Sequence, residues 1–412
     1  MKILHINKQY YVIGGTDTYF FGLTRLLEGH GHTVVPFSTV HPANEESPYA
    51  ASFIPDIETA GSGLSKIKNL GRVFYSPAVE RRVRDIVQRE RPDIAHVHHL
   101  FHKLSPSVLV GLRREGVPVV MTIHDFKFIC PFYMMSRDGM LCQECRGMRY
   151  WHAVQHKCIK QSRVHSALCA FEMWVHRRLH VYEKNVTLFL LPSMFLADKL
   201  REDGFSMPRM LHIPNFADTS LFSPHPAGGD YILFFGKLEK VKGVHLLLEA
   251  LSHLSGTRKL SCRIAGVGTQ RGALEAGVTD EMAGRVMFLG QKSGAELREL
   301  IRNSICVVAP TIGFENGSMT IIEAMCSGRP VIASRCGGNP EYVEDGITGL
   351  LFTSGDARDL AKKLDEILSD PARAEAMGAA ARHTAMTRLS PAAHYDKIMR
   401  AYQIAIDIAS AH

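Results

Sequence analysis

Two glutamates in the stretch FENGSMTIIEA, Glu315 and Glu323, are separated by seven residues. The residues just after Glu315 are small, polar and uncharged, and the chain then turns apolar around Glu323. Three interpretations fit this pattern: an ordinary helix start, a cradle for a phosphate group, and a catalytic pair of carboxylates. Each makes a different demand on the surrounding residues.

The residues after Glu315 predict the start of a helix. Ser318 is a favourable N-cap and Gly328 a favourable C-terminal residue, so MTIIEAMCSG indicates a helix. The free backbone amides at such a start attract a diphosphate, and small residues before it allow close approach. We therefore expect donor binding by a group of consecutive residues: Asn316, Gly317, Ser318, Met319 and Thr320.

The two glutamates then have separate expected tasks. Glu315 precedes the helix and is within reach of the group that a bound diphosphate carries. Glu323 lies about 1.5 turns inside the helix, where a charge in an apolar run needs partners. Ribose hydroxyls are suitable partners for a carboxylate. The alternative is that Glu323 pairs with a nearby Lys or Arg.

Two lysines flank another predicted strand-to-helix turn, FFGKLEKVKGVHLLLEAL. Lys237 and Lys242 at the carboxyl end of a strand could neutralise a diphosphate leaving group. Solvated loop lysines are the alternative interpretation, and the turn alone would favour it.

The first half of the chain offers weaker signals. Gly14 and Gly15 open the first predicted helix, where paired glycines let the backbone approach a ligand. The turn is not G-x-G-x-x-G, which argues against a dinucleotide fingerprint. His124 and Asp125 end another predicted strand, and His124 could donate to a sugar hydroxyl or shuttle a proton.

The histidine-rich run HVHHLFH, 96–102, suggests a metal cluster at first sight. On a strand, however, His96 and His98 face one side and His99 the other. We favour polar histidines satisfied by hydrogen bonds. The chain also has no Asp-x-Asp, which a catalytic divalent metal bridging phosphates would usually need. A P-loop and a nucleophile elbow are absent too.

Short apolar runs and amphipathic segments alternate along the chain, which predicts strands of parallel sheets separated by helices. The predicted strands are 2–7, 33–38, 94–100, 118–124, 187–193, 231–238, 260–268, 285–291, 305–311 and 330–334. This alternation occurs twice, so we expect an α/β protein with two Rossmann-like doubly wound domains. Ligands should bind in a cleft at the carboxyl ends of the strands.

A Pro- and Gly-rich stretch places the expected domain boundary near residue 213. We expect an N-terminal domain over 1–213 and a C-terminal domain over 214–390, with the last helix, 391–408, packing back on the first. The 412 residues start without a signal peptide and contain no membrane-length apolar run, so we expect a cytoplasmic protein.

The net charge of +7 is unevenly distributed: +8 in 1–213 and −1 in 214–412. A basic first half is compatible with a solvated face, and equally with contact to an anionic membrane or acceptor.

Four of the nine cysteines gather in a segment at about 126–160: Cys130, Cys142, Cys145 and Cys158. Their spacing is compatible with a four-thiolate structural zinc site, which would order a polar, basic segment. Reduced thiols in a helical lid and a disulfide are the alternatives.

Together these motifs resemble family 4 of the retaining glycosyltransferases, which have the GT-B fold. The similarity rests on GGTDTYFFGLTRLLEGHGH, HDF, PNFADTSLFSP, FFGKLEKVKGVHLLLEAL, AGVGTQRGALE, FENGSMTIIEAMCSGRPVIAS and GGNPEYVEDGITGLLF, which span nearly the whole chain. The cysteine segment is similar to insertions in members from bacterial surface-polysaccharide pathways.

The resemblance implies transfer of a sugar from a nucleotide-sugar donor to a glycan or lipid-linked glycan, without a catalytic metal. It implies that the C-terminal domain binds the donor and the N-terminal domain the acceptor. Glu323 would hold the ribose, Glu315 the donor sugar, and the two lysines the diphosphate. Gly15 would approach the phosphate and His124 the sugar.

Three departures from the family pattern affect this expectation. Lys237 stands where an Arg is commoner, Phe216 replaces a linker Gly, and Asn316-Gly317 replaces Gly-Phe.

Two rival functions stay open at this point. Another GT-B enzyme, a sugar-nucleotide epimerase or a glycan phosphorylase, would share the fold. A zinc-ribbon protein that binds nucleic acid would explain the cysteines and the basic charge but leave the other motifs unexplained, so we expect no nucleic-acid partner.

Overall fold

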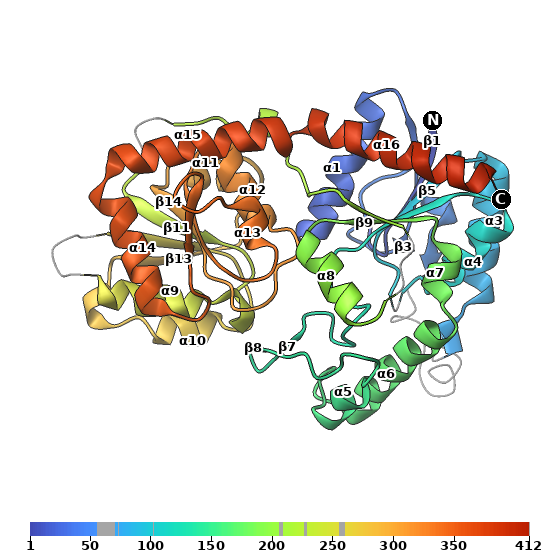
Figure 1. Cartoon of the computed structure of the whole chain (residues 1–412), viewed down its shortest axis with the longest axis horizontal. Coiled ribbons are helices and arrows are strands. Elements are labelled where there is room, and N and C mark those ends of the chain that lie inside the picture. Colours follow the sequence, from blue (N-terminus) through green and yellow to red (C-terminus); the bar gives the residue numbers. More distant parts are fainter. Residues whose placement is uncertain are drawn as a thin grey trace. The chain divides into compact units, whose positions relative to one another are not determined.

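The chain forms two compact units in a computed structural model that describes residues 1–55, 71–72, 74–101, 103–205, 209–225, 229–254 and 260–411. Unit 1 comprises Met1–Tyr133, Glu144–Pro214 and Tyr395–His412. Unit 2 comprises Met134–Gln143 and Asn215–His394. Each unit contains one large sheet flanked by helices (Figure 1).

Unit 1 is built on a six-stranded sheet in the order β10-β9-β6-β5-β1-β2. All neighbouring strands are parallel. Parallel strands covered on both faces are expected to be apolar throughout, and β5, β6 and β9 are fully buried. The bounds are β1 (Lys2–Ile6), β2 (Thr33–Phe37), β5 (Ile94–Val97), β6 (Val119–Thr122), β9 (Leu188–Leu191) and β10 (Met210–His212).

The helices of unit 1 begin at recognisable caps: the hydroxyls of Ser76, Ser162 and Ser193 each accept a first-turn amide. Their bounds are α1 (Gly15–Gly29), α3 (Pro77–Glu90), α4 (Ser107–Arg114), α5 (Trp151–Gln155), α6 (Arg163–Arg178), α7 (Val181–Asn185), α8 (Met194–Glu202) and α16 (Pro391–Ser410). Helix α16 belongs to unit 1 from Tyr395 onward. Short elements are β3 (Thr39–Val40), η1 (Ala50–Ser52) and β4 (Ile54–Pro55).

Unit 2 contains a second six-stranded parallel sheet, in the order β13-β12-β11-β14-β15-β16. The bounds are β11 (Tyr231–Phe235), β12 (Ser261–Ala265), β13 (Val286–Gly290), β14 (Cys306–Ala309), β15 (Val331–Ser334) and β16 (Gly349–Phe352). A small hairpin, β7 (Ser136–Arg137) and β8 (Met140–Leu141), also belongs to this unit.

Two apolar clusters cover the faces of the second sheet. The helices of unit 2 are α9 (Val244–His253), α10 (Arg271–Ala276), α11 (Gly294–Arg302), α12 (Met319–Cys326), α13 (Asn339–Tyr342), α14 (Ala357–Ser369) and α15 (Pro371–Arg388). Short 3-10 turns are η3 (Thr219–Leu221), η4 (Lys240–Lys242) and η5 (Asp280–Met282).

The predicted doubly wound architecture is confirmed, and each of the ten predicted strands overlaps an observed one. The sequence interpretation missed β10 and β16, the strands at one edge of each sheet. Both are short, and periodicity alone does not identify so short an apolar run as a strand. Among the described helices, none combines the length and apolarity that crossing a membrane requires.

Candidate functional site

Three neighbouring strands of unit 2 end at one edge of the sheet, and the predicted donor-site residues follow them. Lys237 and Lys242 come after β11, and Glu315 comes after β14. Strand β15, which pairs with β14, leads into the turn that contains Gly337. Because the strands are parallel, these turns gather at the carboxyl edge, where open α/β sheets bind ligands.

Lys242 and Glu315 form an ion pair at this edge, with the Lys242 Nζ donating to Glu315 Oε1. Their side chains are 34% and 20% exposed, so the pair is partly shielded from water. Lys237 has an exposed side chain, and its amine has no ion pair within the described residues. The structure therefore brings one of the two predicted lysines to Glu315.

The backbone of Glu315 is fixed by the glycine turn after β15. The Gly338 amide donates to the Glu315 carbonyl oxygen over 2.7 Å. Gly337 has φ +62°, and a Cβ there would lie 2.3 Å from the same oxygen. Only glycine fits both the left-handed conformation and this close approach.

The start of α12 is held by two side-chain contacts. The Asn215 amide Nδ2 donates to the Gly317 carbonyl over 2.9 Å, and the Thr320 hydroxyl donates to the Phe235 carbonyl over 3.4 Å. Ser318 is the N-cap residue, as predicted, but its hydroxyl makes no capping hydrogen bond. The first-turn amides are therefore not used by a side-chain cap and can serve an anion.

Asn316 is buried, whereas Gly317, Ser318 and Met319 are half-buried. The backbone of this turn is thus partly accessible at the sheet edge, as a phosphate-binding turn requires.

Glu323 has a perturbed acidity. Burial raises the pKa of its carboxyl from 4.5 to about 7, and the charge of Arg298 opposes that shift only in part. Its neighbours Ile322 and Ala324 are fully buried. Within the described residues no hydrogen bond to the carboxylate is formed, so the predicted Lys or Arg partner is a distant charge only. Glu323 has the environment of a carboxylate that lacks its partner.

The corresponding edge of unit 1 begins with Gly14 and Gly15, the N-cap and first residue of α1. The buried carboxylate of Asp17 accepts the backbone amides of Ile13 and Gly14 over 3.1 and 3.2 Å. Asn7 donates to the same carboxylate over 3.2 Å. Asp17 therefore fixes the shape of the glycine turn, and Gly15 is left exposed.

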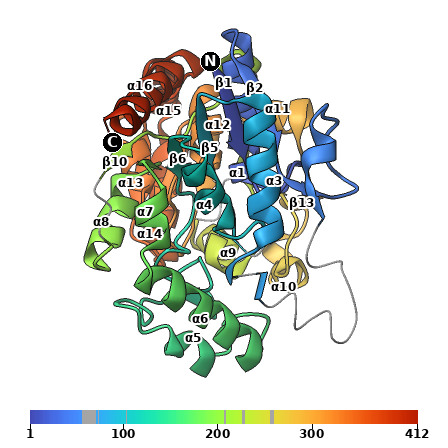
Figure 2. The same ribbon diagram turned by 90° about the vertical axis from the view of Figure 1, so that its right-hand side faces the viewer.

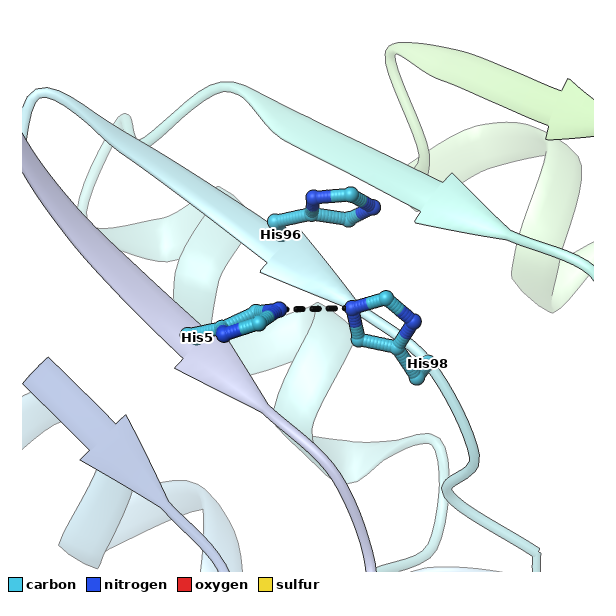
Figure 3. A group of neighbouring side chains, drawn as sticks. All are labelled: His5, His96 and His98. Atoms are coloured by element: carbon cyan, nitrogen blue, oxygen red, sulfur yellow. Dashed lines mark hydrogen bonds between the residues drawn. The ribbon is translucent and has the colours of Figure 1, made fainter. Parts of the chain in front are cut away.

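A chain of hydrogen-bonded histidines crosses three neighbouring strands of unit 1. His5 lies on β1, His98 directly follows β5, and His124 follows β6. The Nε2 atoms of His5 and His98 are 2.7 Å apart (Figure 3). His98 Nδ1 lies 2.8 Å from His124 Nε2. The half-buried His124 is thus the outer end of a buried relay.

The network assigns the tautomer of each ring. Thr24 lies at the inner end and uses its one hydroxyl hydrogen on the Phe20 carbonyl, 3.0 Å away. His5 Nδ1 must therefore donate to Thr24 Oγ1 over 2.9 Å. Burial holds the pKa of His5, His98 and His124 well below 6.5, so each ring carries one proton. His98 then donates from Nε2, His124 donates from Nε2, and His124 Nδ1 keeps a lone pair.

His5, His96 and His98 also meet the distance requirement for a metal site, with three ligand atoms within 4.8 Å. The hydrogen bonds argue against that use. His96 contacts the hydroxyls of Tyr402 and Thr122, both at 2.8 Å. The 2.7 Å between the Nε2 atoms of His5 and His98 is shorter than the roughly 3.3 Å that tetrahedral zinc geometry requires. The prediction of satisfied polar histidines is confirmed for His96 and His98.

His99 lies beyond the end of β5, and its ring contacts that of His124 edge-on with centroids 5.5 Å apart, so the prediction that it faces away from the other histidines is not borne out. It forms an ion pair with Asp125, Nε2 to Oδ2, at 3.2 Å. Burial raises the pKa of Asp125, but the interactions with His99 and the Lys127 amide outweigh it and the net pKa is lowered. His102 lies outside the described residues.

None of the nine cysteines, all of which lie in the described ranges, is joined by a disulfide in the structure. This arrangement favours zinc or reduced thiols over the disulfide alternative. In unit 1, Cys145 is buried and packs with the partly buried Cys158, whereas Cys130 follows the HDF turn. Cys142, half-buried, belongs to the hairpin segment of unit 2.

A second metal-compatible group lies in the same stretch. The Glu144 carboxylate accepts His156 Nε2 over 2.7 Å and lies 3.3 Å from His152 Nδ1. Both histidines come from the region of α5, and all three residues are half-buried. Glu144 immediately precedes Cys145 in sequence.

A buried ion pair connects the HDF turn to helix α6. The Lys127 Nζ donates to Glu172 over 3.2 Å, and the two side chains are 2% and 1% exposed. His176, on the next turn of α6, lies 3.5 Å from the same carboxylate. Lys127 is two residues beyond Asp125, so the pair holds the end of the His124 turn against the helix.

Sequence reasoning missed several residues that position the site, namely His5, Thr24, Asp17, Asn215 and Gly337. Asp17 acts on the neighbouring glycine turn, whereas the other four act on residues far away in the sequence, so no local spacing indicates their contacts. Four of the five lie inside quoted motifs: Asp17 and Thr24 in GGTDTYFFGLTRLLEGHGH, Asn215 in PNFADTSLFSP and Gly337 in GGNPEYVEDGITGLLF.

Two family models match the chain. The model described as "Glycosyltransferase Family 4" matches residues 13–221, and "Glycosyl transferases group 1" matches residues 219–384. Together they cover both units from the first glycine turn to α15.

Curated relatives are similar over most of their length. A phosphatidyl-myo-inositol mannosyltransferase of Mycolicibacterium smegmatis is 25% identical over 365 residues, covering 87% of this chain and 82% of the relative. A glycogen synthase of Mycobacterium tuberculosis is 26% identical over 409 residues, covering 93% of this chain and 89% of the relative.

Solved structures confirm the GT-B fold. The Anabaena protein HepE, in complex with UDP and glucose, superposes with a TM-score of 0.68 at 17% identity, covering 97% of this chain and 98% of that one. Sucrose-phosphate synthase of Thermosynechococcus elongatus superposes with a TM-score of 0.71 at 21% sequence identity, covering 98% of each chain. On the combined evidence of both family models, the chain belongs to glycosyltransferase family 4 and is a nucleotide-sugar glycosyltransferase.

Proposed function

We propose that this protein is a retaining, metal-independent transferase that moves a sugar from a nucleotide onto a glycan or lipid-linked glycan. In this proposal the C-terminal domain over 214–390, which falls in unit 2 apart from Pro214, binds the donor, and the N-terminal domain over 1–213, which makes up most of unit 1, binds the acceptor. The relatives are a mannosyltransferase named for a lipid acceptor and a synthase named for a glycan, which supports both acceptor classes.

The observation that carries the proposal is the different environment of the two glutamates. Glu315 is paired with Lys242 at the sheet edge, whereas Glu323 is half-buried inside α12 and its carboxylate has no hydrogen-bond partner among the residues that the structure describes. A catalytic pair flanking one bond would need both carboxylates at the same reacting atom. One carboxylate at the phosphate turn and one awaiting hydroxyl donors suit a nucleotide diphosphate sugar instead.

The roles follow from these environments. The amides at the start of α12 bind the diphosphate, and Glu323 accepts the ribose hydroxyls. The incoming phosphate competes for Lys242, which exchanges Glu315 for the diphosphate and frees Glu315 to accept sugar hydroxyls. Lys237 adds a second positive charge. In unit 1, Gly14 and Gly15 allow backbone to approach the phosphate.

The reaction proceeds by attack on the face that the leaving group departs from. The bond between the anomeric carbon and the phosphate oxygen breaks, and a bond to the acceptor oxygen forms on the same side. The acceptor proton passes to an oxygen of the departing diphosphate. The two lysines lower the barrier by stabilising the charge that develops on that group.

The test is a panel of nucleotide sugars screened by thermal shift, followed by product analysis with soluble glycan and lipid-linked acceptors. We expect nucleoside diphosphate to appear only when an acceptor is present, with retained anomeric configuration, and with no loss after chelator treatment. Release of sugar phosphate from a glycan by inorganic phosphate would instead identify a phosphorylase.

We expect the histidine relay to set how His124 meets the donor sugar. Through its Nδ1 lone pair, His124 accepts a sugar hydroxyl. Thr24→Val removes the group that orients the chain, so His124 loses its fixed tautomer and kcat/KM falls about tenfold, the value of one hydrogen bond of about 1.4 kcal/mol.

Thr122→Val is the matched control for that substitution, because Thr122 is also a buried threonine bonded to a histidine, but to His96 outside the relay. Nitrogen-15 shifts of His124 report the tautomer directly. Equal losses in both variants, or unchanged His124 shifts in Thr24→Val, would exclude the relay.

We expect one zinc ion per chain, held by Cys130, Cys142, Cys145 and Cys158, in protein purified without chelator. Four cysteines that include a Cys-x2-Cys pair are a suitable donor set for zinc. Cys142→Ser should release the metal, whereas Cys336→Ser, in unit 2, should not. Elemental analysis measures both. Metal retained in Cys142→Ser but lost in His152→Ala/His156→Ala would assign it to the Glu144 group instead.

A further inference from the structure

Helix α6 carries apolar side chains on two opposite faces. Its inner face packs Ala170 and Met173 against the buried Tyr150. Its outer face exposes Val164 by 77%, Phe171 by 56% and Trp174 by 44%. Spacings of seven and three residues place these on one stripe of the helix. Phe171 also meets the ring of Phe74 in the same unit, with centroids 5.5 Å apart, but more than half of Phe171 stays exposed.

The aromatic content of this surface is high for the chain. The whole sequence contains two tryptophans, which are Trp174 on the outer face of α6 and Trp151, 58% exposed, at the start of the adjacent α5. Figure 2 shows α5 and α6 side by side, in agreement with their packing. The rings of Phe171 and Trp174 stack with centroids 6.0 Å apart. Tryptophan prefers the boundary between lipid and water.

The charges around this surface are mostly positive, although Glu144, just before the stretch, pairs with His152 and His156 in the region of α5. Residues 145–180 contain seven Lys or Arg and one acidic residue. That acidic residue, Glu172, is buried against Lys127. The exposed charged residues of this segment are all basic: Arg149, Lys157, Lys160, Arg163 and Arg178. Arg163 and Arg178 are the first and last residues of α6, so positive charge brackets the apolar stripe.

We propose that the outer face of α6, with Trp151 on α5, is a membrane-binding surface for an anionic bilayer. The aromatic and aliphatic side chains enter the headgroup region, and the arginines and lysines contact lipid phosphates. A second copy of the chain fits less well, because a two-fold interface would place this positive surface against itself. Nucleic acid would use the charges but not the exposed Val164. The inference rests on the proposed lipid-linked acceptor, which such a surface would bring to the enzyme.

The test uses the full chain and its own tryptophans. Because the two tryptophans of the chain lie on the adjacent helices α5 and α6, adding vesicles that contain phosphatidylglycerol should shift the fluorescence to shorter wavelength. Pure phosphatidylcholine vesicles should give a much smaller shift. In co-sedimentation, Phe171→Ser/Trp174→Ser should lower the partition coefficient at least about tenfold. Arg163→Gln/Arg178→Gln should remove most of the dependence on anionic lipid.

The control is Ile347→Ser/Met386→Ser, which removes two exposed apolar side chains from unit 2 and should bind vesicles like the parent. In Phe171→Ser/Trp174→Ser, the rate of transfer to a water-soluble acceptor and the melting temperature should be unchanged. These two measurements distinguish a loss of membrane binding from a loss of enzyme activity or folding. Parental binding by that variant overturns the proposal. A fluorescence shift that depends on protein concentration would indicate self-association and would also overturn the proposal. A shift caused by added RNA would indicate nucleic-acid binding and would overturn it too.

Discussion

Lys242→Met lowers kcat for sugar transfer about 10²- to 10³-fold, the cost of removing one preorganised group from a developing anion. Lys242 is placed for this role by its ion pair with Glu315 at the carboxyl edge of the sheet. In the absence of donor the two charges stabilise each other. In the proposed reaction, we expect Lys242 to move from Glu315 to the bound diphosphate, and its contribution to grow as the bond to the sugar breaks.

The matched control is Lys240→Met, because Lys240 lies on the same 3-10 turn and has an exposed side chain. Its kcat should stay near the parental value. Lys242→Arg should recover much of the lost rate, since it keeps the positive charge. Steady-state kinetics with saturating donor measure all three. If Lys242→Met and Lys240→Met lowered kcat equally, Lys242 would be a solvated loop lysine without a special role in transfer.

Glu323→Gln should weaken nucleoside diphosphate binding about 10- to 100-fold, because a charged acceptor for two hydroxyls is replaced by a neutral one. The same change should raise stability at alkaline pH. Burial raises the pKa of Glu323 from 4.5 to about 7, so the folded chain holds a proton that the unfolded chain releases. Ionising the folded carboxyl costs up to about 3 kcal/mol.

The direction of the pKa shift of Glu323 determines the pH range over which the folded state loses stability. A raised carboxyl pKa makes the folded state lose stability as pH rises from about 4.5 to about 7, and the loss is complete above that. Glutamine does not ionise, so Glu323→Gln should gain little over the parent at pH 5 and most at pH 8. Urea denaturation of the ligand-free protein at the two pH values measures the difference.

Binding should show the complementary pH dependence. Ribose hydroxyls bind the ionised carboxylate, so parental affinity should increase as pH passes about 7, with proton release on binding. Glu323→Gln should lack this rise. Glu375→Gln, an exposed glutamate on α15, is the control and should follow the parent in both measurements. If calorimetry showed the same dependence of nucleotide affinity on pH for Glu323→Gln and the parent, the Glu323 carboxylate would not be part of the nucleotide site.

The elements that carry the site could be predicted because each has its signal in a short window. The strand before Glu315, the cap at Ser318 and the helix around Glu323 all follow from patterns of a few residues. The edge strands β10 and β16 were missed because three or four apolar residues lack a usable period.

The coupling between residues could not be predicted, because it depends on which strands become neighbours. His5 and His98 are 93 positions apart and meet only because β1 pairs with β5. In the sequence, Gly337 looks like an ordinary turn glycine. Only the fold shows that it lies against the Glu315 backbone. The altered acidity of Glu323 likewise depends on burial, which a charged residue in an apolar run suggests but does not quantify.

The buried pair of Lys127 and Glu172 bears on how this enzyme could acquire or lose its cysteine-bearing segment. An insertion is often pictured as a module that can be cut out at its ends. Here the start of the segment, at Lys127, is joined to Glu172 of α6 by an ion pair whose side chains are 2% and 1% exposed. Replacing one of these two residues without the other would leave a buried charge without its partner, at a cost of about 3–5 kcal/mol. A chimera that exchanges the segment must therefore exchange residue 127 as well, and the two positions should change together in descent.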